Sequence, residues 1–270
     1  MEKRKSMDFE TIAYEVKEKI ARITMNRRRQ DGGFITTAMW RELQQALDLV
    51  EEDRTVRVLI LEGAGENFSL GWYGPDSPYT NVPGGYDQWG TGGAVKQMTL
   101  IRDQYKKLLF FPKPTIAKVH GKAALAGCNL QLFCDLTIAA ENAQFGHPAM
   151  VHGGVEIVPW IFFIGPKKAK ELWFTGKYID GVEAEKIGMI NKAVPLERLE
   201  AETWGMATTV AKVPLDNDAM PGHGIRLTKA VFNGAMELMG LSNLFNYHLL
   251  GNAWGHSGLG KAEMFKPTGD

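Results

Sequence analysis

The sequence predicts an α/β fold whose buried strands pair in parallel. Two short apolar runs, "VRVLILEG" (residues 56–63) and "TIAKVHG" (residues 115–121), have the length and composition of buried strands. Stretches with helical spacing lie between them, and strands that alternate with helices favour parallel pairing. With 270 residues, 44% of them apolar, the chain can bury a large core.

The N-terminal part predicts a hairpin followed by a helix. In residues 13–26, "AYEVKEKIARITMN", apolar and polar residues alternate, with a turn at residues 17–19. After the loop "RRRQDGGF", Thr36 or Thr37 can cap the N-terminus of a helix. Its apolar positions form one stripe: Met39, Leu43, Leu47 and Val50.

The central part predicts a functional loop and three further strands. Residues 73–93, "YGPDSPYTNVPGGYDQWGTGG", are rich in Gly, Pro and aromatics, and loops of this length are usually functional or disordered. The aromatics favour a partly ordered lid, followed by a helix from about Ala94 to Leu109. After the strand at 115–121, "DLTIAAENAQFG" (residues 135–146) predicts two short strands.

From about Lys167 the sequence predicts mostly helices. "KKAKELWFTG" and "DGVEAEKIGMINKAV" come first, and a C-terminal section begins near Glu197. We therefore expect a core over residues 1–198 and a helical section over residues 199–270.

Composition argues against several classes of partner. Lys plus Arg and Asp plus Glu each number 31, so no net field favours nucleic acid or an anionic membrane. The N-terminus lacks an apolar signal region and no apolar run could span a bilayer, so we expect a soluble, cytoplasmic protein. Cys128 and Cys134, six residues apart in one predicted helix, favour a reducing compartment, and we expect no metal site.

Two segments of small residues join a strand to a helix: "ENFSLGWYG" (residues 66–74) and "HGKAALAGCNL" (residues 120–130). A helix N-terminus leaves backbone N–H groups that can bind an oxyanion. Two such amides that converge on one thioester carbonyl would stabilise an enolate or a tetrahedral adduct. Each segment taken alone is most simply a tight turn.

These motifs occur in a recognisable order. "VLILEGAGENFSLG", then "KPTIAKVHGKAALAGCNLQLFCDLTIAAENAQFGHP", then "ELWFTGKYIDGVEAEKIGMINKAV" resemble the crotonase superfamily, the enoyl-CoA hydratase/isomerase group, over about residues 12–194. The resemblance implies a spiral of ββα units with a C-terminal helical oligomerisation section that supports trimers, commonly paired into hexamers. It also implies an acyl-CoA ligand, so that coenzyme A is part of the substrate and no cofactor is permanently bound.

The resemblance assigns the oxyanion hole to the backbone N–H groups of Trp72 and Ala126. Hydratases of this family carry catalytic Glu residues where Asn129 and Ala149 stand here. Two carboxylates can activate water for addition to a conjugated double bond. Asn129 can hydrogen-bond water or substrate but is no base near neutral pH, and Ala149 can do neither. The standard hydration mechanism is therefore not expected.

Four side chains are candidates for the missing acid or base. His147 and His152 flank the vacant Glu position and Glu156 follows, and a His/Glu couple could activate water near neutral pH. For His147, packing beside Pro148 is the favoured interpretation, whereas for the other two a structural role is equally favoured. Tyr73 could reach the acyl group, although an aromatic pocket wall is the favoured interpretation.

Three cations are candidates for coenzyme A binding. Arg27 and Arg28 follow "ITMN", where the family lays its chain along the nucleotide, and their guanidinium groups could meet the phosphates. A solvated run of charge is equally favoured. Lys229 could reach the phosphates from a neighbouring subunit, but a surface lysine is the favoured interpretation.

The leading hypothesis is an enzyme that stabilises an enolate or oxyanion of an acyl-CoA or related carbonyl substrate, as a divergent hydratase or isomerase. One alternative is a coenzyme-A-independent hydrolase of C–C bonds in β-dicarbonyl compounds, which the His152 and Glu156 pair would serve. Another is a non-catalytic member that binds coenzyme A or acts as a scaffold. Loss of both carboxylates is what that last hypothesis predicts.

Overall fold

A six-stranded sheet forms the centre of the molecule, in the order β1-β2-β3-β4-β6-β9. The computed structural model describes residues 9–25, 32–72, 85–148, 160–213 and 223–256. β1 is antiparallel to β2 and every other neighbouring pair is parallel, as predicted. The strands are β1 (Ala13–Lys17), β2 (Ile20–Met25), β3 (Val58–Gly63), β4 (Thr115–Val119), β6 (Leu136–Ala140) and β9 (Lys192–Val194).

A smaller sheet lies beside the first. It consists of β5 (Lys122–Ala124), β7 (Gln144–Gly146) and β8 (Ile179–Asp180). β5 and β7 are parallel, and β8 runs antiparallel to β7. The two short strands predicted within residues 135–146 are therefore confirmed, and they belong to different sheets.

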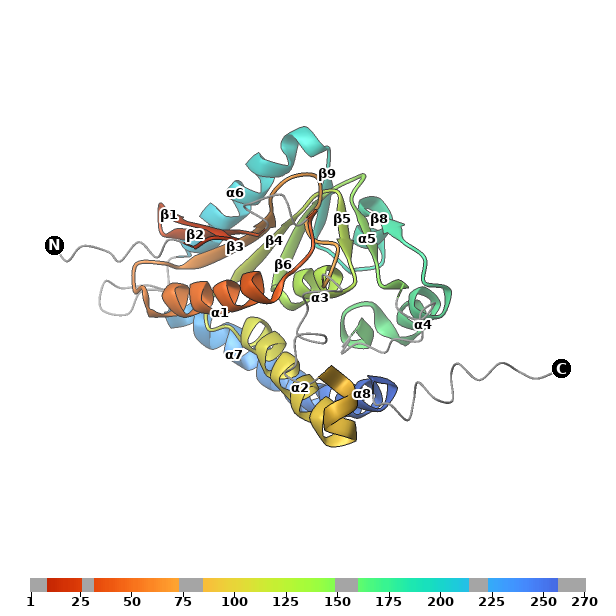
Figure 1. Cartoon of the computed structure of the whole chain (residues 1–270). Helices are drawn as coiled ribbons and strands as arrows, with labels where there is room; N and C mark the ends of the chain where they lie inside the picture. Colours follow the sequence, from red (N-terminus) through yellow and green to blue (C-terminus); the bar gives the residue numbers. More distant parts are fainter. Residues whose placement is uncertain (1–8, 26–31, 73–84, 149–159, 214–222, 257–270) are drawn as a thin grey trace.

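Helices cover both faces of the main sheet, which is why all six residues of β3 are buried. α1 (Thr37–Glu52) begins at the predicted cap, where Thr36 Oγ1 accepts a hydrogen bond from Met39 N at 3.2 Å. The predicted apolar stripe of α1 is buried. α6 (Leu199–Ala211) lies on the opposite side of the sheet from α1 (Figure 1). Its Glu200 carboxylate binds Arg22 of β2 and Lys118 of β4.

A second helical layer consists of α2 (Gly85–Leu109), α7 (His223–Leu238) and α8 (Leu241–His256), at the bottom of Figure 1. α2 is tied to α8 through Arg102 to Asn246 and Lys106 to Ser242. The expected start of α2 near Ala94 is wrong, because the helix begins nine residues earlier. Its start follows Pro83 and Gly84, which disfavour a helix interior. Residues 85–93 of the predicted lid therefore belong to α2, and residues 73–84 lie outside the described residues.

Within the described residues, the section from about Lys167 is mostly helical, as predicted, and it also contains the short strands β8 and β9. These strands are two and three residues long, and their partners β7 and β6 lie far back in the sequence. The helices here are α4 (Trp160–Thr175), kinked at Gly165, then α5 (Gly181–Lys186) and a 3₁₀ turn, Leu196–Arg198. The division at residue 198 stays a prediction; α6 beyond it packs on the main sheet.

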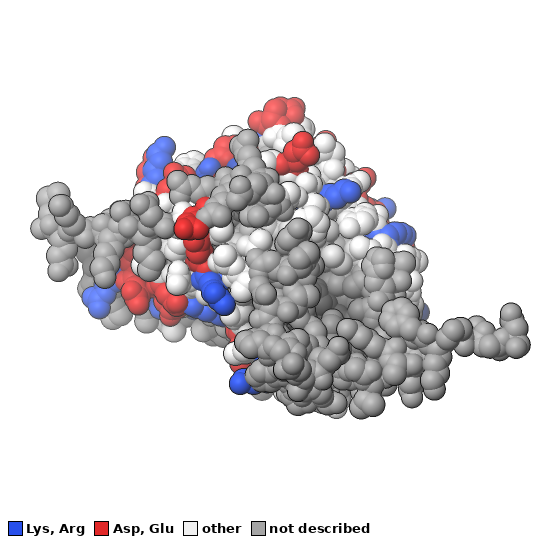
Figure 2. Space-filling model, in the orientation of Figure 1, with Lys and Arg blue, Asp and Glu red and all other residues white. Residues whose placement is uncertain are grey.

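The surface is mixed in charge. On the face shown in Figure 2, acidic and basic side chains are interspersed. Within the described residues, no helix combines the length and the apolar character needed to cross a membrane. The same residues contain no group of three or more His, Cys, Asp or Glu side chains arranged to hold a metal ion.

Candidate active site

The two predicted turns lie against each other and are joined by backbone hydrogen bonds. Ser69 donates from its N to the Lys122 carbonyl at 3.0 Å, and Ala124 N donates to the Ser69 carbonyl at 2.8 Å. Phe68 N binds the His120 carbonyl at 2.9 Å. The segment after β3 is thereby held beside β5, which leads into α3 (Ala126–Phe133).

Glycines allow the backbones of the two turns to approach closely. A Cβ added at Gly121 would lie 1.9 Å from the Glu66 carbonyl oxygen, and one at Gly127 would lie 2.5 Å from that of Ser69. Neither position can hold a side chain without moving backbone. The small residues that marked both turns in the sequence are therefore required by contact between the two turns.

The Trp72 amide points away from the segment that precedes α1. The Gly71 carbonyl accepts a hydrogen bond from Ile35 N at 2.7 Å. In a planar trans peptide the carbonyl and the following N–H point in opposite directions. The N–H of Trp72 is therefore directed to the other side of its segment from Ile35. The Trp72 ring packs edge-on against Trp40, with centroids 4.8 Å apart.

The Ala126 amide points out of the N-terminus of α3. The Leu125 carbonyl accepts from Asn129 N at 3.2 Å along the helix, so the N–H of the same peptide, that of Ala126, is directed the opposite way. Amides of a first helical turn have no acceptor within the helix and carry its positive end. Gly71 and Leu125 adjoin, because a Cβ on Gly71 would lie 2.7 Å from Leu125 Cβ. The two proposed donors thus come from adjacent peptides of adjacent turns.

Asn129 is fully buried and its carboxamide is engaged. The Oδ1 atom accepts a hydrogen bond from the Trp160 indole Nε1 at 3.2 Å. Both side chains are at most 1% exposed. A neutral amide that accepts a bond from an indole cannot act as a proton acceptor near neutral pH. The expectation that Asn129 is no general base therefore rests on its chemistry and also agrees with its contacts.

His147 lies in an aromatic cluster next to Asn129. Its ring stacks on Trp173 with centroids 4.5 Å apart and meets Trp160 edge-on at 6.4 Å. The side chain is 2% exposed. This packing is consistent with the structural interpretation favoured for His147.

The buried thiols near the site are not nucleophiles. Burial raises the pKa of Cys128 and of Cys134 to about 12. The reactive form of cysteine is the thiolate, which is then scarce near neutral pH.

Several candidates lie outside the described residues. They are Tyr73, Ala149, His152 and Glu156 near the acyl site, and Arg27 and Arg28 near the expected nucleotide site. Their roles stay predictions.

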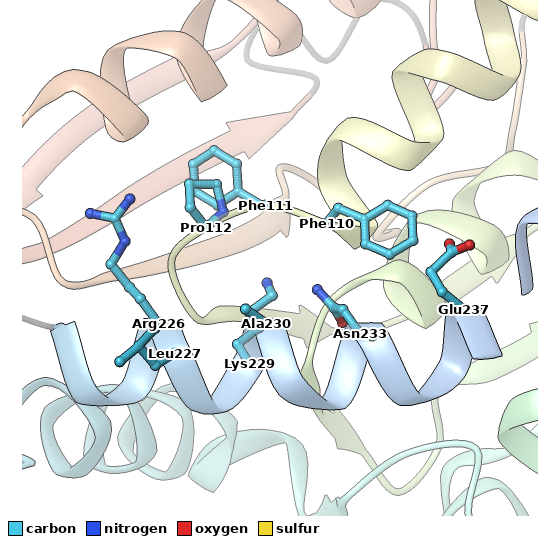
Figure 3. A pocket seen from close by; sticks show the side chains of 10 residues that line it. Phe110, Phe111, Pro112, Arg226, Leu227, Lys229, Ala230, Asn233 and Glu237 are labelled. Carbon is cyan, nitrogen blue, oxygen red and sulfur yellow. The ribbon is translucent and has the colours of Figure 1, made fainter. Parts of the chain in front are cut away.

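Lys229 is not the surface lysine that the sequence favoured. It is 8% exposed, and its Nζ donates to Asp135 Oδ2 at 2.7 Å and to the Lys113 carbonyl at 3.1 Å. Burial lowers the pKa of Lys229, and the neighbouring Asp135 carboxylate opposes this effect. The ammonium group points from α7 toward the segment after α2, where it borders a hollow of about 590 Å³ (Figure 3).

A second hollow, of about 300 Å³, lies at the carboxyl ends of β2 and β3. It is lined by backbone-rich residues: Gly32, Gly33, Ala64, Gly65, Glu66 and Asn67. Ligands of open parallel sheets bind at this edge, beyond the carboxyl ends of the strands. The hollow adjoins the first turn of the candidate site, which begins directly after β3.

Three residues that build this site were not predicted from the sequence. Ser69 joins the turns through its backbone and accepts from Gly71 N through its Oγ at 3.2 Å. Trp160 binds Asn129, and Leu125 caps α3 in a strained conformation, with φ 51° and ψ −126°. Ser69 stands two residues before Gly71 in the predicted turn, and this position could have marked it as part of the site. No local pattern could have paired Trp160 with a residue 31 positions earlier.

Comparison with known proteins gives consistent results. Residues 15–220 match the family described as "Enoyl-CoA hydratase/isomerase". A relative described as a putative enoyl-CoA hydratase, from Mycobacterium tuberculosis, is 35% identical over 286 residues, covering 96% of this chain and 86% of the relative. Another, from Thermus thermophilus, is 31% identical and covers 78% of this chain and 79% of the relative.

Solved structures resemble the chain over nearly its whole length. The crystal structure of a probable enoyl-CoA hydratase from Mycobacterium smegmatis has a TM-score of 0.81 at 28% identity, covering 95% of this chain and 97% of the other. The crystal structure of a probable enoyl-CoA hydratase from Mycobacterium thermoresistibile has a TM-score of 0.78 at 30% identity, covering 94% of this chain and 99% of the other. The fold predicted from the sequence motifs is thus the fold of these proteins.

Proposed function

This chain belongs to the enoyl-CoA hydratase/isomerase family, and on that premise we propose that it is an enzyme acting on a coenzyme A thioester. The backbone N–H groups of Trp72 and Ala126 bind the thioester oxygen and stabilise the negative charge that develops there. Donors fixed before the reaction stabilise such charge without reorganisation. Coenzyme A enters as part of the substrate, and the enzyme holds no permanent cofactor.

One observation supports this proposal above the others. Ile35 N donates a hydrogen bond to the Gly71 carbonyl, and Asn129 N donates one to the Leu125 carbonyl. Each bond fixes one peptide, and in each peptide the N–H group, of Trp72 or of Ala126, points away from the bonded carbonyl. Gly71 and Leu125 are in contact distance, so the two peptides are neighbours. The helix dipole of α3 adds positive potential at Ala126.

The proposed reaction does not use the hydration mechanism in which a pair of carboxylates activates water. Asn129 is an amide bound by Trp160 and cannot take a proton, and position 149 is an alanine. Proton transfer therefore falls to another group, for which His152 and Glu156 are the candidates in the sequence. We propose a divergent hydratase or isomerase in which the oxyanion hole is kept and the acid/base residues are changed.

Coenzyme A approaches along the carboxyl ends of β2 and β3. Arg27 and Arg28 follow β2 and precede Gly32, which lines the hollow of about 300 Å³ there. Their guanidinium groups are suited to phosphate. Lys229 is bound to Asp135, which favours a structural role over a phosphate contact.

The enzyme assembles through its C-terminal helices into a homotrimer, or a hexamer made of two trimers. α7 exposes large apolar side chains: Leu227, Val231, Phe232 and Leu238. Contiguous exposed apolar surface of this kind marks sites of protein association.

Infrared spectroscopy of a thioester labelled with ¹³C at the carbonyl tests the oxyanion hole. Acetyl-CoA bound to the wild-type protein should show a carbonyl stretch at lower frequency than in water, because two donors polarise the bond. Trp72→Pro deletes one donor and should reverse much of this shift, and reduce turnover of any substrate at least about a hundredfold. Trp72→Phe keeps the N–H and should retain the shift. Retention of the full shift by a folded Trp72→Pro protein would refute the assignment.

A further inference from the structure

Leu125 has a backbone conformation that normally requires glycine. Its φ of 51° and ψ of −126° lie outside the regions open to side chains with a Cβ. Among the described residues, the other positive φ angles outside glycine belong to Glu18 and Lys19, in the hairpin turn between β1 and β2. Hairpin turns commonly use such angles, whereas a helix cap with a leucine does not. Strain of this kind persists where the surrounding structure enforces it, and it is concentrated at functional sites.

Both sides of the Leu125 backbone are held in place. Its N donates to the Gly146 carbonyl at 3.0 Å, and its carbonyl accepts from Asn129 N at 3.2 Å. The second bond fixes the Leu125–Ala126 peptide, which carries the Ala126 N–H. The conformation of Leu125 therefore determines where the Ala126 donor points.

The Leu125 side chain lies against the other donor segment. A Cβ built on Gly71 would lie 2.7 Å from Leu125 Cβ and 3.2 Å from Leu125 Cδ1. Gly71 itself has a φ of 90°, and its peptide carries the Trp72 N–H. The leucine side chain thus occupies the contact between the peptide before Trp72 and the peptide before Ala126. It is partly buried there.

We infer that Leu125 is a positioning residue for the oxyanion hole. Its side chain is a spacer that sets the distance between the Trp72 and Ala126 N–H groups, which both bind the thioester oxygen. This inference rests on the proposed function. Leu125 touches no reacting atom itself; it acts through the two peptides that it separates. Its bulk keeps Gly71 at a fixed distance, and its strained backbone aims the Ala126 N–H.

The test compares Leu125→Gly, Leu125→Ala and Leu125→Met. Glycine adopts the backbone angles of residue 125 without strain, so Leu125→Gly keeps the cap of α3 and removes the spacer. Leu125→Met keeps the bulk and should behave like the wild type. Lys19→Gly is the matched control, because it relieves another positive φ angle in the hairpin turn, outside the candidate site.

Two readouts separate positioning from stability: the ¹³C carbonyl stretch of bound acetyl-CoA, and the dissociation constants of acetyl-CoA and of coenzyme A by calorimetry. Leu125→Gly should lose most of the carbonyl shift and weaken acetyl-CoA binding at least about fivefold more than coenzyme A binding, since loss of one donor costs more than this in a transition state. Leu125→Met and Lys19→Gly should change neither readout. If Leu125→Gly does not fold, Leu125→Ala carries the same comparison.

The outcomes distinguish this inference from the function on which it rests. An unchanged or larger carbonyl shift in a folded Leu125→Gly protein, with a normal shift in the wild type, overturns the spacer role alone. Absence of any shift in the wild-type protein overturns the oxyanion hole, and the spacer role with it.

Discussion

At the scale of single residues, the proposed chemistry depends on the orientation of two peptide groups. Each is fixed by a hydrogen bond to its carbonyl, from Ile35 to Gly71 and from Asn129 to Leu125. Asn129 therefore serves the site twice: its backbone N–H orients the Ala126 peptide, and its side chain binds Trp160. The uncharged amide of Asn129 at the start of α3 therefore has structural contacts.

Replacing Trp160 with phenylalanine tests the structural role of Asn129. The substitution removes the donor to a fully buried Oδ1 atom, which should cost about 1–3 kcal/mol of unfolding free energy. Chemical denaturation measures this. Trp173→Phe is the matched control, because Trp173 belongs to the same aromatic cluster and does not bind Asn129. Equal losses from both substitutions would show that the hydrogen bond contributes nothing beyond packing.

At the scale of elements, charged side chains anchor helices to neighbouring segments of the chain. On α1, the Glu42 carboxylate accepts bonds from the backbone N–H groups of Glu10, Thr11 and Ile12 and from the Thr11 hydroxyl. On α7, Lys229 reaches Asp135, which also accepts from Thr115 at the start of β4. The first set of contacts anchors the segment that enters β1, and the second anchors the C-terminal helices to the core.

Glu42 should make stability depend on pH in the acid range. Burial would raise the pKa of Glu42, but the hydrogen bonds from Thr11 and the backbone outweigh this and lower it below 4.5. The stabilisation is therefore complete above pH 4.5, the value for the unfolded chain, and is lost as the pH falls through the folded-state pKa. Urea denaturation from pH 6 to pH 3 should show a steeper loss for wild type than for Glu42→Gln. Parallel curves would contradict this role.

Removing one partner of the Lys229 and Asp135 pair should destabilise the fold. Lys229→Met leaves a partly buried carboxylate without its cation, at a cost of about 2–4 kcal/mol. Thermal and chemical unfolding measure the loss. Lys170→Met, at an exposed position of α4, should change stability by less than about 0.5 kcal/mol. A loss at Lys229 no larger than at Lys170 would mean that the ion pair does not anchor α7.

At the scale of the whole molecule, local sequence patterns predicted the fold class. They could not predict contacts between residues that are distant in the sequence. The hairpin, β3, β4 and α1 with its Thr36 cap follow from periodicity and capping within the segments themselves. The strands β8 and β9 depend on partners distant in the sequence. The candidate site was predictable in part for the same reason. The small residues of the two turns could be recognised in the sequence, whereas the contacts of Trp160 and Leu125 form only in the folded chain.

The exposed face of α7 should mediate self-association. Val231 is 72% exposed and Phe232 is 67% exposed on α7, and burial of such side chains between subunits is favourable. Light scattering after size-exclusion chromatography should give three or six times the monomer mass. Val231→Glu should shift the protein toward monomer, whereas Arg54→Glu, at an exposed position after α1, should not. A wild-type monomer at micromolar concentration would contradict the assembly.

Calorimetric titration of the purified wild-type protein with acetyl-CoA and with coenzyme A tests the proposed thioester site, with crotonyl-CoA turnover followed on the same sample. Both ligands should bind, and acetyl-CoA should bind more tightly, because the proposed oxyanion hole adds contacts to its carbonyl. Hydration of crotonyl-CoA should be slow, since Asn129 and Ala149 cannot activate water as a pair of carboxylates would. If neither acetyl-CoA nor coenzyme A binds, the result would contradict a site built for a coenzyme A thioester.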